Sequence, residues 1–132
     1  MKAYWDSSAL VAASADLTLR TRLRDERGFV RSHALAEIFS ALTGGNLTIR
    51  LEADAAARTV ENLAQDLDFI ELTPHEILGA LKQARKRGVR GGRVHDFMHA
   101  MAAEKSGGHE LLTTDENDFE SLTHSVKFHQ VG

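Results

Sequence analysis

The alternation of short apolar runs with longer segments of helical spacing constrains this chain of 132 residues more than any other feature. Runs of three to six residues with apolar or aromatic members are too short for helices and fit strands. They are Lys2–Trp5, Phe29–Ser32, Leu67–Leu72, Glu110–Thr113 and Val126–Phe128. Because strands that alternate with helices usually pair in parallel, this pattern predicts an α/β fold with helices on both faces of one parallel sheet.

The segments between these runs repeat apolar residues every three or four positions, as amphipathic helices do. The predicted helices span Ala9–Ala13, Leu17–Arg27, the segment with Leu35, Ile38, Phe39 and Leu42, Glu52–Asp66, Pro74 to about Arg87, and the segment with Val94, Phe97, Met98 and Met101. Thr73 is a favourable N-cap before Pro74. Gly44-Gly45-Asn46 and Gly107-Gly108 are expected to end two of these helices.

Bulk composition limits the classes of protein to which the chain can belong. Its length suits a single domain, which we expect to span residues 1–132. The absence of cysteine excludes a disulfide framework, a thiolate metal site and a cysteine nucleophile, and it suits a reducing cytoplasm. The acidic residue at position 6 and the lack of a long apolar run argue against a signal peptide and a membrane span. The formal net charge of −3 differs from that of a typical basic nucleic-acid-binding protein.

Four acidic residues stand at positions where the predicted fold could bring ligands together. Asp6 directly follows the first strand, and Asp115 follows the fourth strand after one intervening residue. In open parallel sheets ligands bind at the carboxyl ends of the strands, so these two carboxylates could meet at one edge. Asp96 lies in the first turn of a predicted helix, where the helix dipole favours an anion. Glu37 lies early in the helix that follows the second strand.

Each of these acids also has an ordinary structural interpretation, which spacing alone favours. Asp6 could be a solvated turn residue or a helix cap, and Asp115 and Asp118 could cap a last short helix. Asp96 could serve only to complement the helix dipole. The apolar stripes of the two helices place Asp96 and Glu37 on faces away from the core.

Taken in order, four segments of the chain resemble the PIN-domain family, and especially the VapC-type toxins of bacterial toxin–antitoxin pairs. They are Tyr4–Leu10 (YWDSSAL), Leu35–Thr43 (LAEIFSALT), Asp96–Ala102 (DFMHAMA) with the glycines that follow it, and Leu111–Phe119 (LLTTDENDF). These segments stand in the family's order and run from the first strand nearly to the end of the chain. Each is weak by itself, but the four together in a chain of this length are specific.

The resemblance implies a three-layer α/β/α PIN-like (Rossmann-like) fold with a short central parallel sheet and an acidic site for Mg²⁺ or Mn²⁺. The family's catalytic and metal-binding acids correspond to Asp6, Glu37, Asp96 and Asp115. Glu37 would act directly or through a water, and Asp118 would be an auxiliary acid. The family's small hydroxyl residues correspond to Ser8 and Thr113, which would hold carboxylates or a water in place. Mg²⁺ and Mn²⁺ are hard cations that prefer such oxygen ligands.

By the same resemblance the chain would be an endoribonuclease, the toxin of a type II toxin–antitoxin pair, which hydrolyses RNA phosphodiester bonds with a metal-activated water. Its partners would be RNA and a cognate antitoxin, and it would form a homodimer or a hetero-oligomer with the antitoxin in the cytoplasm. Phe39 and Leu42, or the residues near Leu10 and Val11, could form an antitoxin groove or could be ordinary core. Two alternatives stay open: an RNA-processing nuclease outside a toxin–antitoxin system, and a non-catalytic PIN-fold interaction module.

A run of basic residues just before Asp96 could give the chain a positive surface for nucleic acid despite its negative net charge. It comprises Lys82, Arg85, Lys86, Arg87, Arg90 and Arg93. These cations could contact RNA phosphates beside the acidic site. They could equally be a solvated helix end whose positive charges complement the C-terminal dipole.

Two other enzyme classes fit part of the pattern. Phosphotransferases of the haloacid-dehalogenase type also carry an Asp after the first strand, but they need a second Asp where this chain has Ser8. His95 and His99 flank Asp96, and their spacing of four residues on one helical face suits zinc. The chain has no Glu in the position that a zinc protease needs and no clear third ligand, so surface or packed histidines are expected instead.

Overall fold

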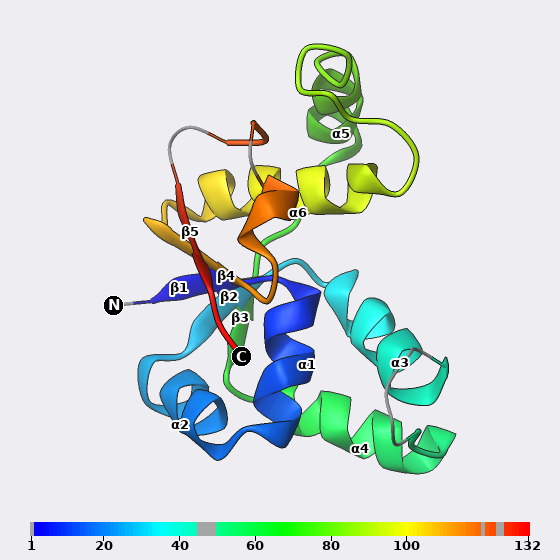
Figure 1. Ribbon diagram of the computed structural model, residues 1–132, viewed down its shortest axis with the longest axis vertical. Helices are drawn as coiled ribbons and strands as arrows, with labels where there is room; N and C mark the ends of the chain where they lie inside the picture. Colours follow the sequence, from blue (N-terminus) through cyan, green and yellow to red (C-terminus); the bar gives the residue numbers. More distant parts are fainter. Residues whose placement is uncertain (1, 45–49, 120, 124–125) are drawn as a thin grey trace.

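The computed structural model describes residues 2–44, 50–119, 121–123 and 126–132. Its centre is a five-stranded sheet in which all neighbouring strands are parallel, in the order β3-β2-β1-β4-β5 (Figure 1). The strands are β1 (Ala3–Trp5), β2 (Gly28–Val30), β3 (Leu67–Phe69), β4 (Glu110–Thr113) and β5 (Lys127–Gln130). The apolar runs therefore located all five strands, with the ends of β4 as expected and those of the others within three residues.

Helices cover both faces of the sheet, which gives the three-layer α/β/α architecture expected from the sequence (Figure 1). One face carries α1 (Ser7–Ala15), α2 (Leu17–Glu26), α3 (Ala34–Gly44) and α4 (Ala53–Ala64). The other face carries α6 (Arg93–Ser106), which packs on β2, β4 and the 3₁₀ turn η1 (Glu116–Phe119), with α5 (Pro74–Leu81) beyond it. In the described parts of the chain, no helix is both long enough and apolar enough to cross a membrane.

The core is densest around β1, whose three residues are all buried. Tyr4 pairs with Phe29 of β2 on one side and with Leu111 of β4 on the other, so β1 is enclosed by strands as well as by helices. A parallel strand covered on both faces needs apolar residues facing both ways, and the sequence Ala3-Tyr4-Trp5 supplies them. This burial holds the end of β1, and the residue that follows it, in a fixed place.

Two helices differ from the sequence expectation at an end for a physical reason that the structure shows. The first helix begins earlier, at Ser7, because the carboxylate of Asp6 accepts the backbone N–H of Ala9 and caps it. The helix expected to reach Arg87 ends at Leu81, and residues 82–88 form turns instead. The N–H of Val89 bonds to the carbonyl of Ala84, which folds the chain back and buries Val89. Local helix propensity is overridden there by this turn and by the burial of Val89.

The remaining helix signals agree with the structure. Thr73 and Glu76 form a reciprocal capping box at the start of α5, with Pro74 in the first turn. Gly107 ends α6 in the left-handed conformation, with φ of 75°. The helix α3 ends at Gly44, whereas Gly45 and Asn46 lie outside the described residues.

The strand order places a topological switch at the centre of the sheet. From β1 the chain proceeds outward through β2 and β3 on one side, and β4 and β5 lie on the other. In open α/β sheets the crevice between the carboxyl ends of such oppositely wound neighbours is the usual ligand-binding position. The backbone N–H of Asp6 donates to the carbonyl of Leu112 at 3.0 Å, so the two strand ends are joined there.

Replacing Gly28 by alanine is expected to destabilise the protein by about 1–3 kcal/mol, because a Cβ there would lie 2.6 Å from Cδ1 of the buried Trp5. Gly79→Ala is the matched control, because Gly79 lies within α5 with nothing inside 4 Å of its Cβ position. That change should raise stability by about 0.5–1 kcal/mol. Urea denaturation of both variants measures these effects. Equal stability of Gly28→Ala and the unmodified protein would contradict this packing of Trp5.

Candidate functional site

Asp6 lies at the centre of the carboxyl edge of the sheet, and it is only 5% exposed. Its Oδ1 accepts the backbone N–H of Ala9 at 2.8 Å and the hydroxyl of Ser8 at 2.7 Å. Both bonds fall on the same carboxylate oxygen, so Oδ2 remains for a further ligand. Because a buried carboxylate is costly without compensation, Asp6 depends on these donors and on the N-terminal dipole of α1.

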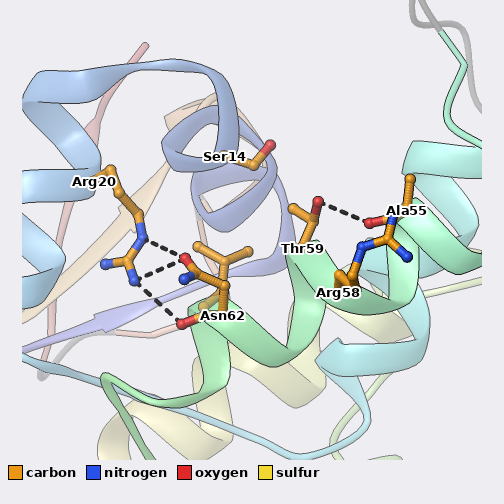
Figure 2. A pocket seen from close by; sticks show the side chains of 7 residues that line it. Ser14, Arg20, Ala55, Arg58, Thr59 and Asn62 are labelled. Atoms are coloured by element: carbon orange, nitrogen blue, oxygen red, sulfur yellow. Dashed lines mark hydrogen bonds between the residues drawn. The ribbon is translucent and has the colours of Figure 1, made fainter.

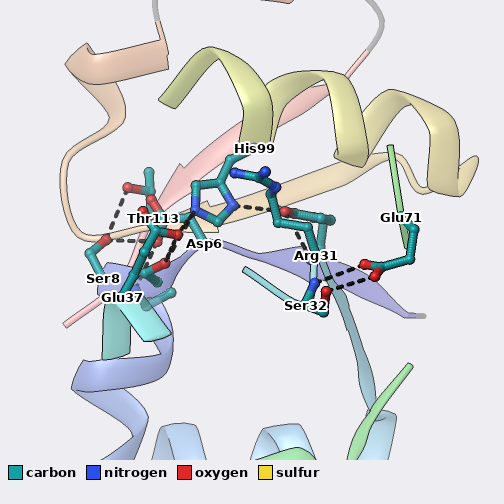
Figure 3. Close-up of polar contacts among 11 residues, drawn as sticks. Asp6, Ser8, Arg31, Ser32, Glu37, Glu71, His99 and Thr113 are labelled. Carbon is teal, nitrogen blue, oxygen red and sulfur yellow. Dashed lines mark hydrogen bonds and ion pairs between the residues drawn. The ribbon is translucent and has the colours of Figure 1, made fainter. Parts of the chain in front are cut away.

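Ser8 links the ends of the two strands on either side of the switch. Its hydroxyl donates to Asp6, accepts the backbone N–H of Thr114 at 3.0 Å, and lies 3.3 Å from the hydroxyl of Thr113. The Thr113 hydroxyl in turn accepts the N–H of Asp115 at 3.2 Å. Figure 3 shows Ser8, Thr113 and Asp6 side by side. The two small hydroxyl residues therefore orient the backbone and the carboxylate at this edge.

Asp96 is half-buried near the start of α6, although its helix periodicity suggested a face away from the core. Burial and the negative charges of Asp118 and Asp6 raise the pKa of Asp96 to about 6, although the charges of His99 and Arg93 act in the opposite direction. Three carboxylates from distant parts of the chain thus lie close enough to repel one another.

The last acidic segment contributes through Asp118 more than through Asp115. The side chain of Asp118 is half-buried, and burial together with the charges of Asp115 and Asp6 raises its pKa, with Arg93 opposing. Asp115 is exposed, and its Oδ1 accepts the backbone N–H of Asn117 at 3.1 Å within the turn that leads into η1. Asp118, for which the family resemblance implied an auxiliary role, therefore lies close enough to Asp6 and Asp96 for their charges to interact, and it is less exposed than Asp115.

Glu37 reaches the same edge from α3 but has a different environment. Its Oε1 accepts the hydroxyl of Ser7 at 2.8 Å and contacts Nε2 of His99 at 3.0 Å. Burial acts to raise the pKa of Glu37, but the hydrogen bond and charge of His99, together with Ser7, outweigh it and lower the pKa to about 2. Glu37 is therefore ionised throughout the physiological range, and the surface position suggested by periodicity is half-buried instead.

A buried chain of hydrogen bonds orients His99 against Glu37 (Figure 3). The Tyr4 hydroxyl lies 2.7 Å from Nδ1 of His99 and accepts the backbone N–H of Arg31 at 3.2 Å. Burial raises the pKa of Tyr4, so its hydroxyl keeps its proton. Because a carboxylate only accepts hydrogen bonds, Nε2 of His99 carries the proton that points at Glu37. Tyr4 and His99 thus fix the position of the Glu37 carboxylate.

Three members of this chain, Tyr4, Ser7 and His99, were not among the site residues expected from the sequence. In the sequence, His99 stood out only as half of a zinc pair with His95, an alternative that was set aside. One signal was available: His99 lies three residues after Asp96, so the two share one face of α6. Tyr4 and Ser7 gave none, because a strand tyrosine and a helix serine are ordinary residues at those positions.

The basic run does not form one helix face in the structure. Lys82, Arg85, Lys86 and Arg90 are exposed in the turns before α6. Arg87 bonds to the carbonyl of Ser121 at 3.2 Å, and the Ser121 hydroxyl bonds back to the Arg87 carbonyl. Arg93 is half-buried, and its charge acts on Asp96 and Asp118. The expected helix does not extend through this run, because α5 ends at Leu81 with Lys82 as its C-cap, so only Lys82 lies at a helix end.

A separate hollow of about 410 Å³ lies between the end of α1, α2 and α4 (Figure 2). Arg20 crosses it, donating to the side-chain and backbone oxygens of Asn62 and pairing with Asp66 at 2.7 Å. Arg58 also lines it, and none of its lining side chains is acidic. The contacts of Arg20 hold α2 against α4. Because its lining is basic and not acidic, this hollow does not suit a cation, and the acidic edge of the sheet is the candidate functional site.

Asp96→Asn is expected to stabilise the metal-free protein at pH 7.5 by about 1–2 kcal/mol, a rise in Tm of roughly 3–10 °C. The pKa of Asp96 in the folded protein is about 6, above the usual value of 3.8. Ionising Asp96 therefore costs folding stability, and this cost grows as the pH rises from about 4 to 6 and is complete above 6. Thermal unfolding in EDTA at pH 7.5 and pH 4 measures it, and the gain should shrink at pH 4. A lower Tm for Asp96→Asn at pH 7.5 would contradict the proposed repulsion.

Comparison with known proteins agrees with this geometry. The chain is similar to the crystal structure of PAE2754 from Pyrobaculum aerophilum, with a TM-score of 0.70 and 22% sequence identity over 97% of this chain and 89% of that one. At this identity the likeness shows a shared fold. No curated protein gave a significant match. The family model for the PIN domain matches residues 3–124, and PIN domains are generally metal-dependent nucleases. The chain therefore belongs to the PIN-domain family.

Proposed function

We propose that this PIN domain is a Mg²⁺- or Mn²⁺-dependent endoribonuclease that acts as the toxin of a type II toxin–antitoxin pair. The observation that carries the nuclease assignment is the grouping of Asp6, Asp96 and Asp118 at the carboxyl edge of the sheet, where burial and, after it, the charges of Asp118 and Asp6 raise the pKa of Asp96 to about 6. Carboxylates held together in this way favour a bound cation, because its charge offsets their repulsion. All three offer oxygen ligands, which suit Mg²⁺ and Mn²⁺.

The acidic residues divide this task by their positions. Asp6 would hold the cation through Oδ2, since Oδ1 is already bonded to Ala9 and Ser8. Asp96 and Asp118 lie close enough to Asp6 for their charges to interact and would complete the protein ligands, and the exposed Asp115 would contact the cation through water. The cation supplies positive charge that activates water and stabilises the charge growing on the scissile phosphate.

Glu37 is suited to orienting the attacking water rather than to taking its proton. A carboxylate whose pKa is about 2 is a weak base, but it is a permanent hydrogen-bond acceptor. His99 and Ser7 hold its Oε1 in place, so a water bound to Glu37 would be fixed relative to the acidic edge. Precise positioning of this kind can supply a large part of a rate enhancement.

The RNA would approach along the basic residues that precede α6. Arg85, Lys86 and Arg90 are exposed, and the charge of Arg93 reaches the acidic cluster itself. Positive side chains that lead to an anionic site offset its repulsion of the phosphate backbone. These residues, with Arg87 anchored on Ser121, are our candidates for RNA contacts.

The toxin assignment rests on the resemblance to VapC-type proteins and on an apolar hollow beside the acidic edge. The hollow, of about 470 Å³, is lined by Ser7, Ser8, Val11, Ala12, Ala41 and Thr114. Leu10 and Leu42 are buried core and do not belong to it, whereas Phe39 on α3 is 36% exposed. An amphipathic antitoxin segment seated there would cover the site. We further propose a cytoplasmic location and assembly as a homodimer or with the antitoxin.

Asp6→Asn and Asp96→Asn should each reduce cleavage of a labelled single-stranded RNA by at least about 100-fold, because each removes a charge that holds the cation. The assay uses EDTA-treated protein with Mg²⁺ or Mn²⁺ restored. Asp118→Asn should lose more activity than Asp115→Asn, because Asp118 faces the cluster. The exposed Asp54 of α4 gives the control variant Asp54→Asn, which should match the unmodified protein. Undiminished cleavage by Asp6→Asn or Asp96→Asn would refute the nuclease site.

Induced expression in a bacterial host should arrest growth, and Asp96→Asn should relieve the arrest at equal protein levels. Co-expression of a small protein encoded next to this chain should restore growth with the unmodified sequence, because the antitoxin would cover the active edge. Colony counts after induction measure both effects. RNA cleavage in vitro without growth arrest in the cell would support an RNA-processing nuclease in place of a toxin.

A further inference from the structure

A second cluster of potential metal ligands lies beside the acidic edge and is built on histidine. His33 directly precedes α3, Glu37 follows it by one turn, and His95 is the third residue of α6. The N–H of Glu37 bonds to the carbonyl of His33 at 3.3 Å, which fixes the spacing of these two residues. Helices from opposite faces of the sheet therefore bring the three side chains together.

The geometry of this cluster is close to that of a metal site. One ligand atom from each residue lies within 4.8 Å of the other two. The imidazole rings of His33 and His95 are almost parallel, with 15° between their planes and 6.1 Å between centroids. Zn–N bonds are about 2.0–2.1 Å long, so two ligands of one ion lie at most about 4.2 Å apart. Both histidines are exposed, and small side-chain rotations would close the remaining gap.

The cluster is not explained by direct ion pairing. Within the described part of the chain, the ion pair that Glu37 forms is with His99, at 3.0 Å. His33 and His95 stay beyond ion-pair distance from Glu37 while remaining within 4.8 Å. Both hydrogen bonds to the Glu37 carboxylate use Oε1, so Oε2 remains for a cation between the carboxylate and the two rings.

The donor set differs in kind from that of the acidic cluster. Two imidazole nitrogens with one carboxylate oxygen suit borderline divalent transition metals such as Zn²⁺, whereas Mg²⁺ prefers oxygen ligands alone. Three protein ligands would leave a position for water. His99 does not belong to this set, because Tyr4 and Glu37 occupy its two nitrogens. The zinc alternative set aside from the sequence paired His95 with His99, whereas the structure stacks His95 on His33, which directly precedes α3.

We infer that His33, Glu37 and His95 form a binding site for a divalent transition metal, distinct from the site formed by Asp6, Asp96 and Asp118. Glu37 lies between the two clusters, so it is the one residue that both would use. The histidine site does not depend on the proposed nuclease function. Its two imidazole ligands lie outside the acidic cluster, and they favour transition metals over Mg²⁺.

Zn²⁺ binding to the full-length, metal-stripped protein tests this inference. Isothermal titration with Zn²⁺ in constant excess Mg²⁺ should show one bound ion, and His33→Ala and His95→Ala should each weaken its affinity at least about tenfold. His75→Ala is the matched control, since His75 is an exposed histidine on α5, and it should bind as the unmodified protein does. Co²⁺ absorption gives an independent readout, because loss of an imidazole ligand changes its visible bands.

The outcomes separate this site from the nuclease proposal. Unchanged Zn²⁺ affinity in both His33→Ala and His95→Ala, with folded proteins by circular dichroism, would overturn the inference. Loss of Zn²⁺ binding in Asp118→Asn with both histidine variants unaffected would also overturn it, by placing the metal in the acidic cluster. A protein that binds Zn²⁺ through the histidines but never cleaves RNA would sustain this site and refute the nuclease.

Discussion

Repulsion between carboxylates at the carboxyl edge of the sheet is the constraint on which the site depends. Asp6, Asp96 and Asp118 come from a strand end, a helix start and a 3₁₀ turn, and each adds negative charge to one partly buried region. The fold tolerates this because β1 is enclosed on all sides, so Asp6 cannot move away without disrupting the core. The repulsion is confined to these carboxylates, and the burial of β1 keeps Asp6 in place despite it. Unfavourable arrangements held in place by the rest of the fold are common at functional sites.

The same edge holds two acids in opposite electrostatic states. The pKa of Asp96 is about 6 because burial and like charges act together, whereas that of Glu37 is about 2 because His99 and Ser7 stabilise its charge. Environments that separate the pKa values of neighbouring acids are how a site gives similar residues different roles. Here one environment favours a cation, and the other fixes a hydrogen-bond acceptor next to it.

Much of the fold could be predicted because the strands are short, apolar and separated by helical spacing. The ends of β4 and the start of α5 were specified locally, by apolar residues and by Thr73 with Pro74. The end of α5 was not, because it depends on Val89 folding back under the turns that precede α6. A helix-forming composition continues past Leu81, and only a contact made in the folded state ends the helix there.

The acids were visible in the sequence, but their arrangement was not. The order of the segments indicated Asp6, Glu37, Asp96 and Asp115 through a family resemblance, and the parallel sheet explains why strand-end residues gather at one edge. Which oxygen of Asp6 is occupied, and whether Asp115 or Asp118 faces inward, depends on hydrogen bonds in turns. Such bonds join residues whose relative positions are undefined until the strands pair.

Histidine shows the same division most clearly. The sequence alone determined the α/β class, the acidic residues after predicted strands and the presence of imidazoles near Asp96. Only the tertiary structure decided that His99 turns inward to Tyr4 and Glu37, while His95 meets His33 from the opposite layer. The physical reason is that periodicity records which face of a helix is apolar, whereas the partner of a polar side chain is set by how separate elements pack against one sheet.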